Sequence, residues 1–206
     1  MKTIVIKDND LSYAVEVIKS GGLVGVPTET VYGLAANGYD DAAVARIYEV
    51  KGRPALKPLS LLVPNIIVAA NVWAGIPKSA HLLAEAFWPG PLTIVLPRRD
   101  TVPYIVTAGG NTVGVRCPDH PKTLKLLRLA GVPIAAPSAN LSDMPSPKSA
   151  KEVLEYFDGQ INCVIDGGRC KLGVESTVVS LTTQPYKILR QGALPEEHIR
   201  RALGLD

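Results

Sequence analysis

The stretch Leu23-Val24-Gly25-Val26-Pro27-Thr28-Glu29-Thr30-Val31-Tyr32-Gly33-Leu34-Ala35 decides the fold. Its first four residues form an apolar run of strand length, which Pro27 ends because proline cannot donate to a β-ladder. Hydroxyls at Thr28, Thr30 and Tyr32 then alternate with a carboxylate and a valine, and Gly33 frees the backbone to turn. A buried strand that leads into such residues predicts a polar pocket at the edge of an open α/β sheet, where these sheets bind ligands. Taken alone, the stretch also suits a plain polar loop with a glycine turn.

Strand and helix patterns alternate outward from this stretch along the whole chain. We expect strands at residues 3–6, 23–26, 59–63, 92–96, 112–116, 133–136, 163–166, 177–181 and 187–189. We expect helices at 10–19 with Asn9 as N-cap, from Asp40 or Asp41 to Gly52, and at 66–73, 78–87, 121–129, 149–157 and after Pro195. Some late strands follow each other without room for a helix. The pattern therefore predicts one α/β domain with a mixed sheet.

The bulk properties describe an ordinary globular chain. It has 206 residues, 47% hydrophobic and 20% charged, enough to bury about 70% of its unfolded surface. The net charge of +3 and 5% aromatic content indicate no dedicated nucleic-acid surface. The three cysteines show no metal-like pairing, so we expect free structural thiols. No signal peptide or membrane span is apparent, and we expect a cytoplasmic location.

Further motifs occur in order after the opening stretch, and together they resemble the YrdC-like family. They are Lys51–Pro54 with Lys57–Leu59, Trp88–Thr93, Val113–Arg116 through Pro121, Ala135–Asn140 with Pro145–Pro147, Gly173–Thr177 and Leu189–Ala193. The resemblance covers residues 10–195. It implies a twisted, largely open mixed sheet flanked by helices around a concave cavity. Because the chain ends at Asp206, we expect a single YrdC-like domain over residues 1–206 without the C-terminal accessory domain of longer members.

The resemblance also implies an activity. L-threonine, bicarbonate and ATP would give threonylcarbamoyl-adenylate and pyrophosphate, a nucleotidyltransferase reaction that begins the N6-threonylcarbamoyladenosine modification of tRNA. The sequence offers no acyl-enzyme serine motif and no histidine in the context of a catalytic base. An activity that needs no protein nucleophile is consistent with that.

Lys51, Arg53 and Lys57 place three cations within seven residues at the end of a helix and in the loop after it. Such cations often only complement a helix C-terminus, yet Pro54 and Pro58 stiffen this loop. We expect Lys51 and Arg53 to lie in a region that faces solvent. The resemblance implies that these three residues bind the phosphates of ATP and that Lys51 and Arg53 are the catalytic residues.

The remaining site residues are also carried over from the resemblance, although Thr112 and Arg116 share one face of a strand by their spacing and the serines could be simple caps. The expected ATP contacts are Lys51, Arg53, Lys57, Thr112, Ser138, Asn140, Ser146 and Arg190. The expected threonine contacts are Thr30, Tyr32, Leu62, Arg116, Ala136 and Ser176. Asp143 and Lys148 depart from the family pattern, where many members have glycine and threonine.

No carboxylate cluster of ligand type occurs in the sequence, so we expect no metal-ligating residues and a Mg²⁺ ion held mainly through the phosphates. Expected partners beyond the substrates are a weak tRNA contact and downstream threonylcarbamoyl-transferase proteins, with no membrane. Two other functions stay open. One is a carbamoyl-AMP-forming module of hydrogenase maturation. The other is an RNA-binding or ribosome-maturation factor that uses the same concave surface without catalysis.

Overall fold

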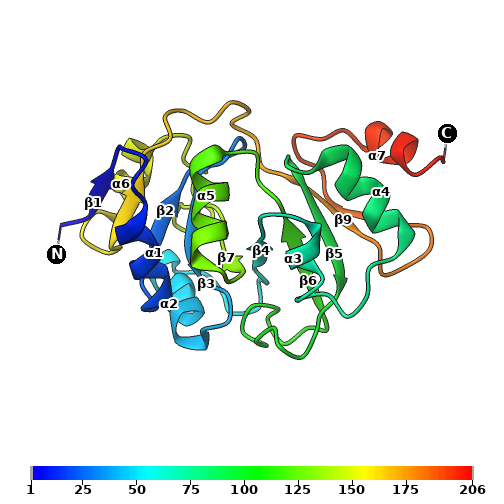
Figure 1. The fold of residues 1–206 in the computed structure, drawn as a ribbon, viewed down its shortest axis with the longest axis horizontal. Coiled ribbons are helices and arrows are strands. Elements are labelled where there is room, and N and C mark those ends of the chain that lie inside the picture. The colour runs from blue at the N-terminus through cyan, green and yellow to red at the C-terminus, as the bar shows by residue number, and fades with distance from the viewer. Residues whose placement is uncertain (1, 206) are drawn as a thin grey trace.

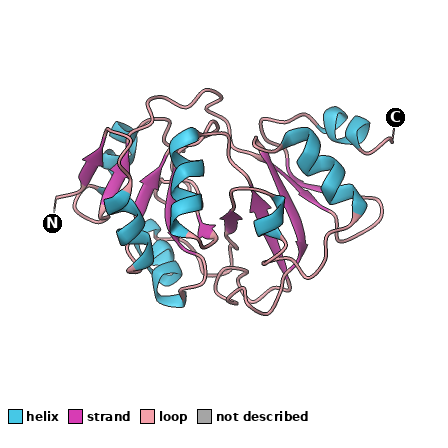
Figure 2. Ribbon diagram, in the orientation of Figure 1, coloured by secondary structure: helices cyan, strands magenta, loops and turns pink. Residues whose placement is uncertain are grey.

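The computed structural model describes residues 2–205, which fold around a ten-stranded sheet in the order β1-β8-β2-β3-β7-β4-β6-β5-β9-β10 (Figure 1, Figure 2). The strands are β1 (Ile4–Ile6), β2 (Val24–Val26), β3 (Gly33–Asn37), β4 (Ser60–Leu62), β5 (Leu92–Pro97), β6 (Thr112–Arg116), β7 (Ile134–Ala135), β8 (Cys163–Ile165), β9 (Thr177–Ser180) and β10 (Lys187–Arg190). The helices are α1 (Ser12–Lys19), α2 (Asp41–Lys51), α3 (Ile66–Ala69), α4 (Lys78–Phe87), α5 (Pro121–Ala130), α6 (Ala150–Phe157) and α7 (Glu196–Ala202).

The sheet joins segments that are far apart in the chain. The N-terminal β1 pairs in parallel with β8, and β5 lies between β6 and β9. Parallel pairs such as β4 with β6 stand beside antiparallel pairs such as β5 with β6. The expected mixed, open α/β sheet is therefore confirmed. Figure 1 shows α3, α4 and α5 in front of the strands, on the viewer's side of the sheet.

Side-chain alternation along β4, β5 and β6 separates the hydrophobic core from a polar face. Leu61, Ile94 and Val115 belong to the core, together with Trp73 and residues of α4. Their neighbours in sequence point to the other face, because successive side chains of a strand alternate. The registers place Gly114 between Ser60 and Val95, and Leu62 beside Arg116, so these residues share that second face. The sheet thus provides the floor for a cavity.

Helix α2 begins and ends as its sequence predicts. The Asp40 side chain accepts hydrogen bonds from the backbone N–H groups of Ala42 and Ala43. Gly52 ends the helix in the left-handed conformation, with φ of 57°. Ser149 caps α6 in the same way as Asp40 caps α2, through the N–H of Glu152. The cap of α2 fixes Lys51 as the last helical residue.

Three local expectations are wrong. Asn9 does not cap α1, because Leu11 is the N-cap residue and Asp10 instead binds the backbone and hydroxyl of Ser12. Gly33 does not turn the chain but begins β3, where it pairs with Val26 of β2. The helix expected over residues 66–73 ends after one turn at Ala69, since Trp73 forms a β-bridge with Arg98.

The cysteines are unpaired, as expected from the sequence. Cys117, Cys163 and Cys170 are free thiols, and burial raises the pKa of each above its ordinary value. No helix within residues 2–205 combines the length and the apolar character that crossing a membrane requires.

Candidate functional site

A polar cavity of about 730 Å³ lies on the second face of the sheet. Its floor comes from β4, β5 and β6, and its walls from the segments around β3, α2, β7, β9 and β10. Most of the predicted site residues line it: Thr30, Tyr32, Arg53, Lys57, Leu62, Thr112, Arg116, Ala136, Ser138, Ser176 and Arg190. The polar end of the opening stretch and the later motifs therefore meet in one space.

Gly114 keeps the centre of the floor open. A Cβ atom at this position would lie 3.0 Å from Ser60 Oγ and 3.1 Å from Thr93 Cγ2. Any longer side chain would project from the floor into the cavity. A ligand can therefore approach the main chain of β6 here.

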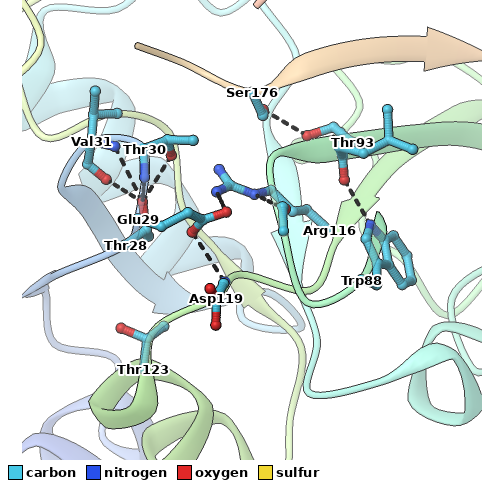
Figure 3. Close-up of polar contacts among 12 residues, drawn as sticks. Thr28, Glu29, Thr30, Val31, Trp88, Thr93, Arg116, Asp119, Thr123 and Ser176 are labelled. Atoms are coloured by element: carbon cyan, nitrogen blue, oxygen red, sulfur yellow. Dashed lines mark hydrogen bonds and ion pairs between the residues drawn. The ribbon is translucent and has the colours of Figure 1, made fainter. Parts of the chain in front are cut away.

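Arg116 forms a buried ion pair at one end of the cavity (Figure 3). Its Nη2 donates to Glu29 Oε1 at 2.7 Å, and its Nε donates to the carbonyl of Gly90 at 3.1 Å. Glu29 Oε2 accepts the backbone N–H of Asp119 at 3.0 Å. Arg116 and Glu29 are only 7% and 4% exposed, so the interaction is weakly screened by solvent.

Hydroxyl groups beside this pair form two short chains (Figure 3). Thr28 donates its proton to the Val31 carbonyl at 2.6 Å, so Thr30 must be the donor in the 2.8 Å contact between the two threonine hydroxyls. Thr30 then offers only its lone pairs to a ligand. Ser176 shares a 2.9 Å hydrogen bond with Thr93, and Arg190 donates to the Ser176 carbonyl and hydroxyl.

Tyr32 uses its hydroxyl within the protein. The hydroxyl donates to the Gly168 carbonyl at 2.8 Å and accepts the Gly167 N–H at 3.0 Å. Burial raises the pKa of Tyr32 to about 12, which keeps the phenol neutral. Tyr32 therefore contributes a ring wall and a tether to the 167–168 turn, and its assignment as a threonine contact stays a prediction.

Cations gather at the opposite end. Arg53 donates to the carbonyls of Lys57 and Pro58, and burial together with the nearby charge of Arg190 lowers its pKa. Arg190 pairs with Glu175 at 2.8 Å, and Lys57 pairs with Asp143 at 3.2 Å. Asp143 has φ of 64°, which explains why glycine suits this position in the family.

Lys51 does not face solvent as expected. It is 2% exposed, lies beneath the cavity, and its Nζ donates to the carbonyls of Ser138 and Asn140. Burial, reinforced by the charge of Arg53 and opposed by that of Glu175, lowers its pKa to about 8. Lys51 therefore holds the segment that presents Ser138 to the cavity.

Asn140 and Ser146 also stand outside the cavity lining. Asn140 donates to the carbonyls of Leu141 and Met144, while its Oδ1 is buried without a hydrogen-bond partner. Ser146 donates to Glu175 Oε1 at 2.9 Å. Their assignments as ATP contacts stay predictions.

Sequence reasoning did not assign Glu29, Thr93 and Glu175, although each belongs to the site. The signal was partly present, since Glu29 stands between two threonines and Glu175 directly precedes Ser176 and Thr177 in the motifs quoted above. Their partners come from distant segments, Arg116 for Glu29 and Ser146 for Glu175. Within residues 2–205, no group of three or more His, Cys, Asp or Glu lies together as metal ligands would.

The fold and the cavity define a class: a mixed α/β protein with a ligand site in which an ion-paired arginine and a cation cluster stand at opposite ends. The sequence model of the Sua5_yciO_yrdC family, described as "Telomere recombination", matches residues 16–192. The chain belongs to this family, as its motifs predict.

Named relatives extend the comparison. The chain is 52% identical to the threonylcarbamoyl-AMP synthase of Pyrococcus abyssi, over 91% of this chain and 55% of the relative. It is 43% identical to that of Bacillus subtilis, over 96% and 57%. The chain thus spans about half the length of these curated relatives.

Solved structures have the same fold. A structure of P. abyssi Sua5 complexed with L-threonine matches with a TM-score of 0.95 at 48% identity, covering 99% of this chain and 61% of that one. Escherichia coli YciO matches with a TM-score of 0.83 at 24% identity, covering 96% and 98%, and supports the fold alone.

Proposed function

We propose that the chain carries the threonylcarbamoyl-AMP synthase activity, a nucleotidyltransferase reaction of L-threonine, bicarbonate and ATP. The observation that carries the proposal is a single cavity with Arg116, Thr30 and Ser176 at one end and Arg53 and Lys57 at the other, and with Arg190 in contact with Ser176. A guanidinium with free N–H groups suits a carboxylate, and a cluster of cations suits a triphosphate. The names of the relatives and the threonine complex of P. abyssi Sua5 support the same assignment.

In this proposal the chain positions reactants and balances charge. Threonine lies with its carboxylate toward Arg116 and its hydroxyl among Thr30 and Ser176. Bicarbonate supplies CO₂ to the threonine amine with loss of water. An oxygen of the resulting carbamate attacks the α-phosphorus, and pyrophosphate leaves toward Arg53 and Lys57.

The triphosphate end needs cations that touch the phosphates and groups that hold them. Arg53, Lys57 and Arg190 line the cavity, and Lys51 supports Ser138 from beneath. The two oxygens of Glu175 are already bonded to Ser146 and Arg190. A Mg²⁺ ion would therefore be carried by the phosphates, whose charge it would help to neutralise.

The test is pyrophosphate release from ATP, measured with threonine, bicarbonate or both omitted. We expect release only when both are present, and a loss of about 10²-fold in turnover for Arg53→Ala, which removes a cation from developing phosphate charge. The control is Lys19→Ala, which removes an exposed cation at the C-terminal end of α1. Release that ignores threonine would contradict the proposal, and RNA binding without any release would favour the non-catalytic platform.

A further inference from the structure

We propose that Glu29 is a positioning residue that fixes the orientation and neutralises the charge of Arg116, so that this end of the cavity selects an amino-acid carboxylate over a phosphate. The inference deepens the proposed function and rests on it for the identity of the amino acid. Glu29 does not line the cavity but lies directly behind the side chain that does.

The orientation follows from the two contacts of the guanidinium. Nε and Nη2 of Arg116 donate to Gly90 and Glu29 respectively. Because a guanidinium is planar, two bonds from different nitrogens fix the plane of the group. Nη1 has no hydrogen-bond partner among the described residues, and it belongs to a side chain that lines the cavity. The arrangement leaves one nitrogen ready for an incoming acceptor.

Glu29 is itself held from two sides. Its Oε2 accepts the N–H of Asp119, in the turn between β6 and α5, and its backbone carbonyl accepts the N–H of Leu172 at 2.8 Å. The carboxylate therefore keeps its place without help from a ligand. Because the Glu29 side chain is already ordered, little further conformational entropy is lost when Arg116 binds a substrate.

Charge separates the two ends of the cavity. Arg116 and Glu29 together are neutral and buried. At the other end, the charges of Lys51, Arg53 and Lys57 exceed that of Asp143, while Arg190, in contact with Ser176, is paired with Glu175. Because Coulomb attraction is strong where solvent is excluded, a multiply charged phosphate prefers the cationic end. The neutral Arg116–Glu29 pair attracts a phosphate less strongly than an unpaired cation would. It therefore favours the amino acid, a zwitterion without net charge.

Two variants separate orientation from charge. Glu29→Gln removes the charge and leaves Arg116 as an unpaired cation. We expect the threonine dissociation constant to rise about 10-fold or more, and inhibition by pyrophosphate to tighten several-fold because a new cation faces the cavity. Glu29→Asp keeps the charge but shortens the reach. We expect it to weaken threonine binding without tightening inhibition by pyrophosphate.

The readouts are threonine binding by calorimetry and pyrophosphate inhibition of turnover, with the unfolding temperature of each variant. Glu155→Gln, an exposed position on α6, makes the same change of charge and should leave both constants unaltered. Equal weakening of threonine and pyrophosphate in Glu29→Gln would overturn the inference, since it would indicate a merely structural role. If Glu29→Gln fails to fold, the threonine dissociation constant of Glu29→Asp still tests the inference. A value equal to that of the parent chain would overturn it.

The parent chain, measured in parallel, separates this inference from the proposed function. If the parent chain binds threonine but releases no pyrophosphate in response to it, the proposed function alone is contradicted. Competition between threonine and pyrophosphate, measured by calorimetry, would then still test the selection at Arg116. Normal turnover with unchanged constants in both Glu29 variants would overturn the inference alone. Absence of threonine binding in the parent chain would overturn both.

Discussion

Lys51 is the residue whose environment departs furthest from its sequence pattern. A cation at the end of a helix, before a loop that contains prolines, is typical of a solvated position, yet tertiary contacts bury Lys51 beneath the cavity. Its pKa is lowered to about 8, first by burial and then by Arg53. The unfolded chain, where the pKa is 10.5, therefore binds more protons than the folded chain between about pH 8 and 10.5.

This difference gives a pH-dependent stability. The cost of burying the charged ammonium is fully present below pH 8 and disappears as the pH rises to 10.5, so folding stability from this group increases across that window. We expect the free energy of unfolding of the parent chain to rise relative to Lys51→Met over this interval. Urea titrations at several pH values measure it, and other groups that titrate cancel in the comparison. Parallel curves for the two proteins would contradict the assignment.

At the scale of one element, β6 connects the fold to the site. Its residues alternate between the core, at Val113 and Val115, and the cavity, at Thr112, Gly114 and Arg116. We expect Gly114→Val to keep the strand, because β-branched residues suit strands, and to lower affinity for ATP and threonine about 10-fold or more by filling the floor. Gly75→Val is the control, since a Cβ there meets nothing within 4 Å. Calorimetry with each ligand measures both, and unchanged affinity in Gly114→Val would show that ligands avoid this floor.

Elements defined by local pattern were predictable, and those defined by distant partners were not. The limits of α2 follow from Asp40 and Gly52, whose effects are confined to one helical turn. By contrast, β3 begins at a glycine that resembles a turn, and only its pairing with Val26 makes it a strand.

The same division applies to the site. The hydroxyls and cations were visible as residue types, so the cavity lining was largely predictable through the family resemblance. Which hydroxyl donates, and which cation is already paired, depends on contacts such as Glu29 with Arg116, which are 87 positions apart. No local pattern encodes those contacts.

At the scale of the whole molecule, the cavity joins the two halves of the sheet. Its walls include Thr30 before β3 and Arg190 of β10, strands that stand six places apart in the sheet order. A ligand that spans the cavity binds only when both halves are folded, so its binding free energy adds to global stability.

We therefore expect ATP to raise the unfolding temperature. At a concentration of 100 times the dissociation constant, the gain is about 2.7 kcal/mol, or roughly 5–10 °C for a chain of this size. Arg53→Ala should lose most of the ATP shift and keep the threonine shift, because the two ligands occupy opposite ends. Scanning calorimetry with each ligand alone provides the measurement. Equal loss of both shifts would mean that Arg53 supports the cavity as a whole. A shift produced by RNA but by neither small ligand would mean that the cavity face of the sheet serves as a platform for RNA.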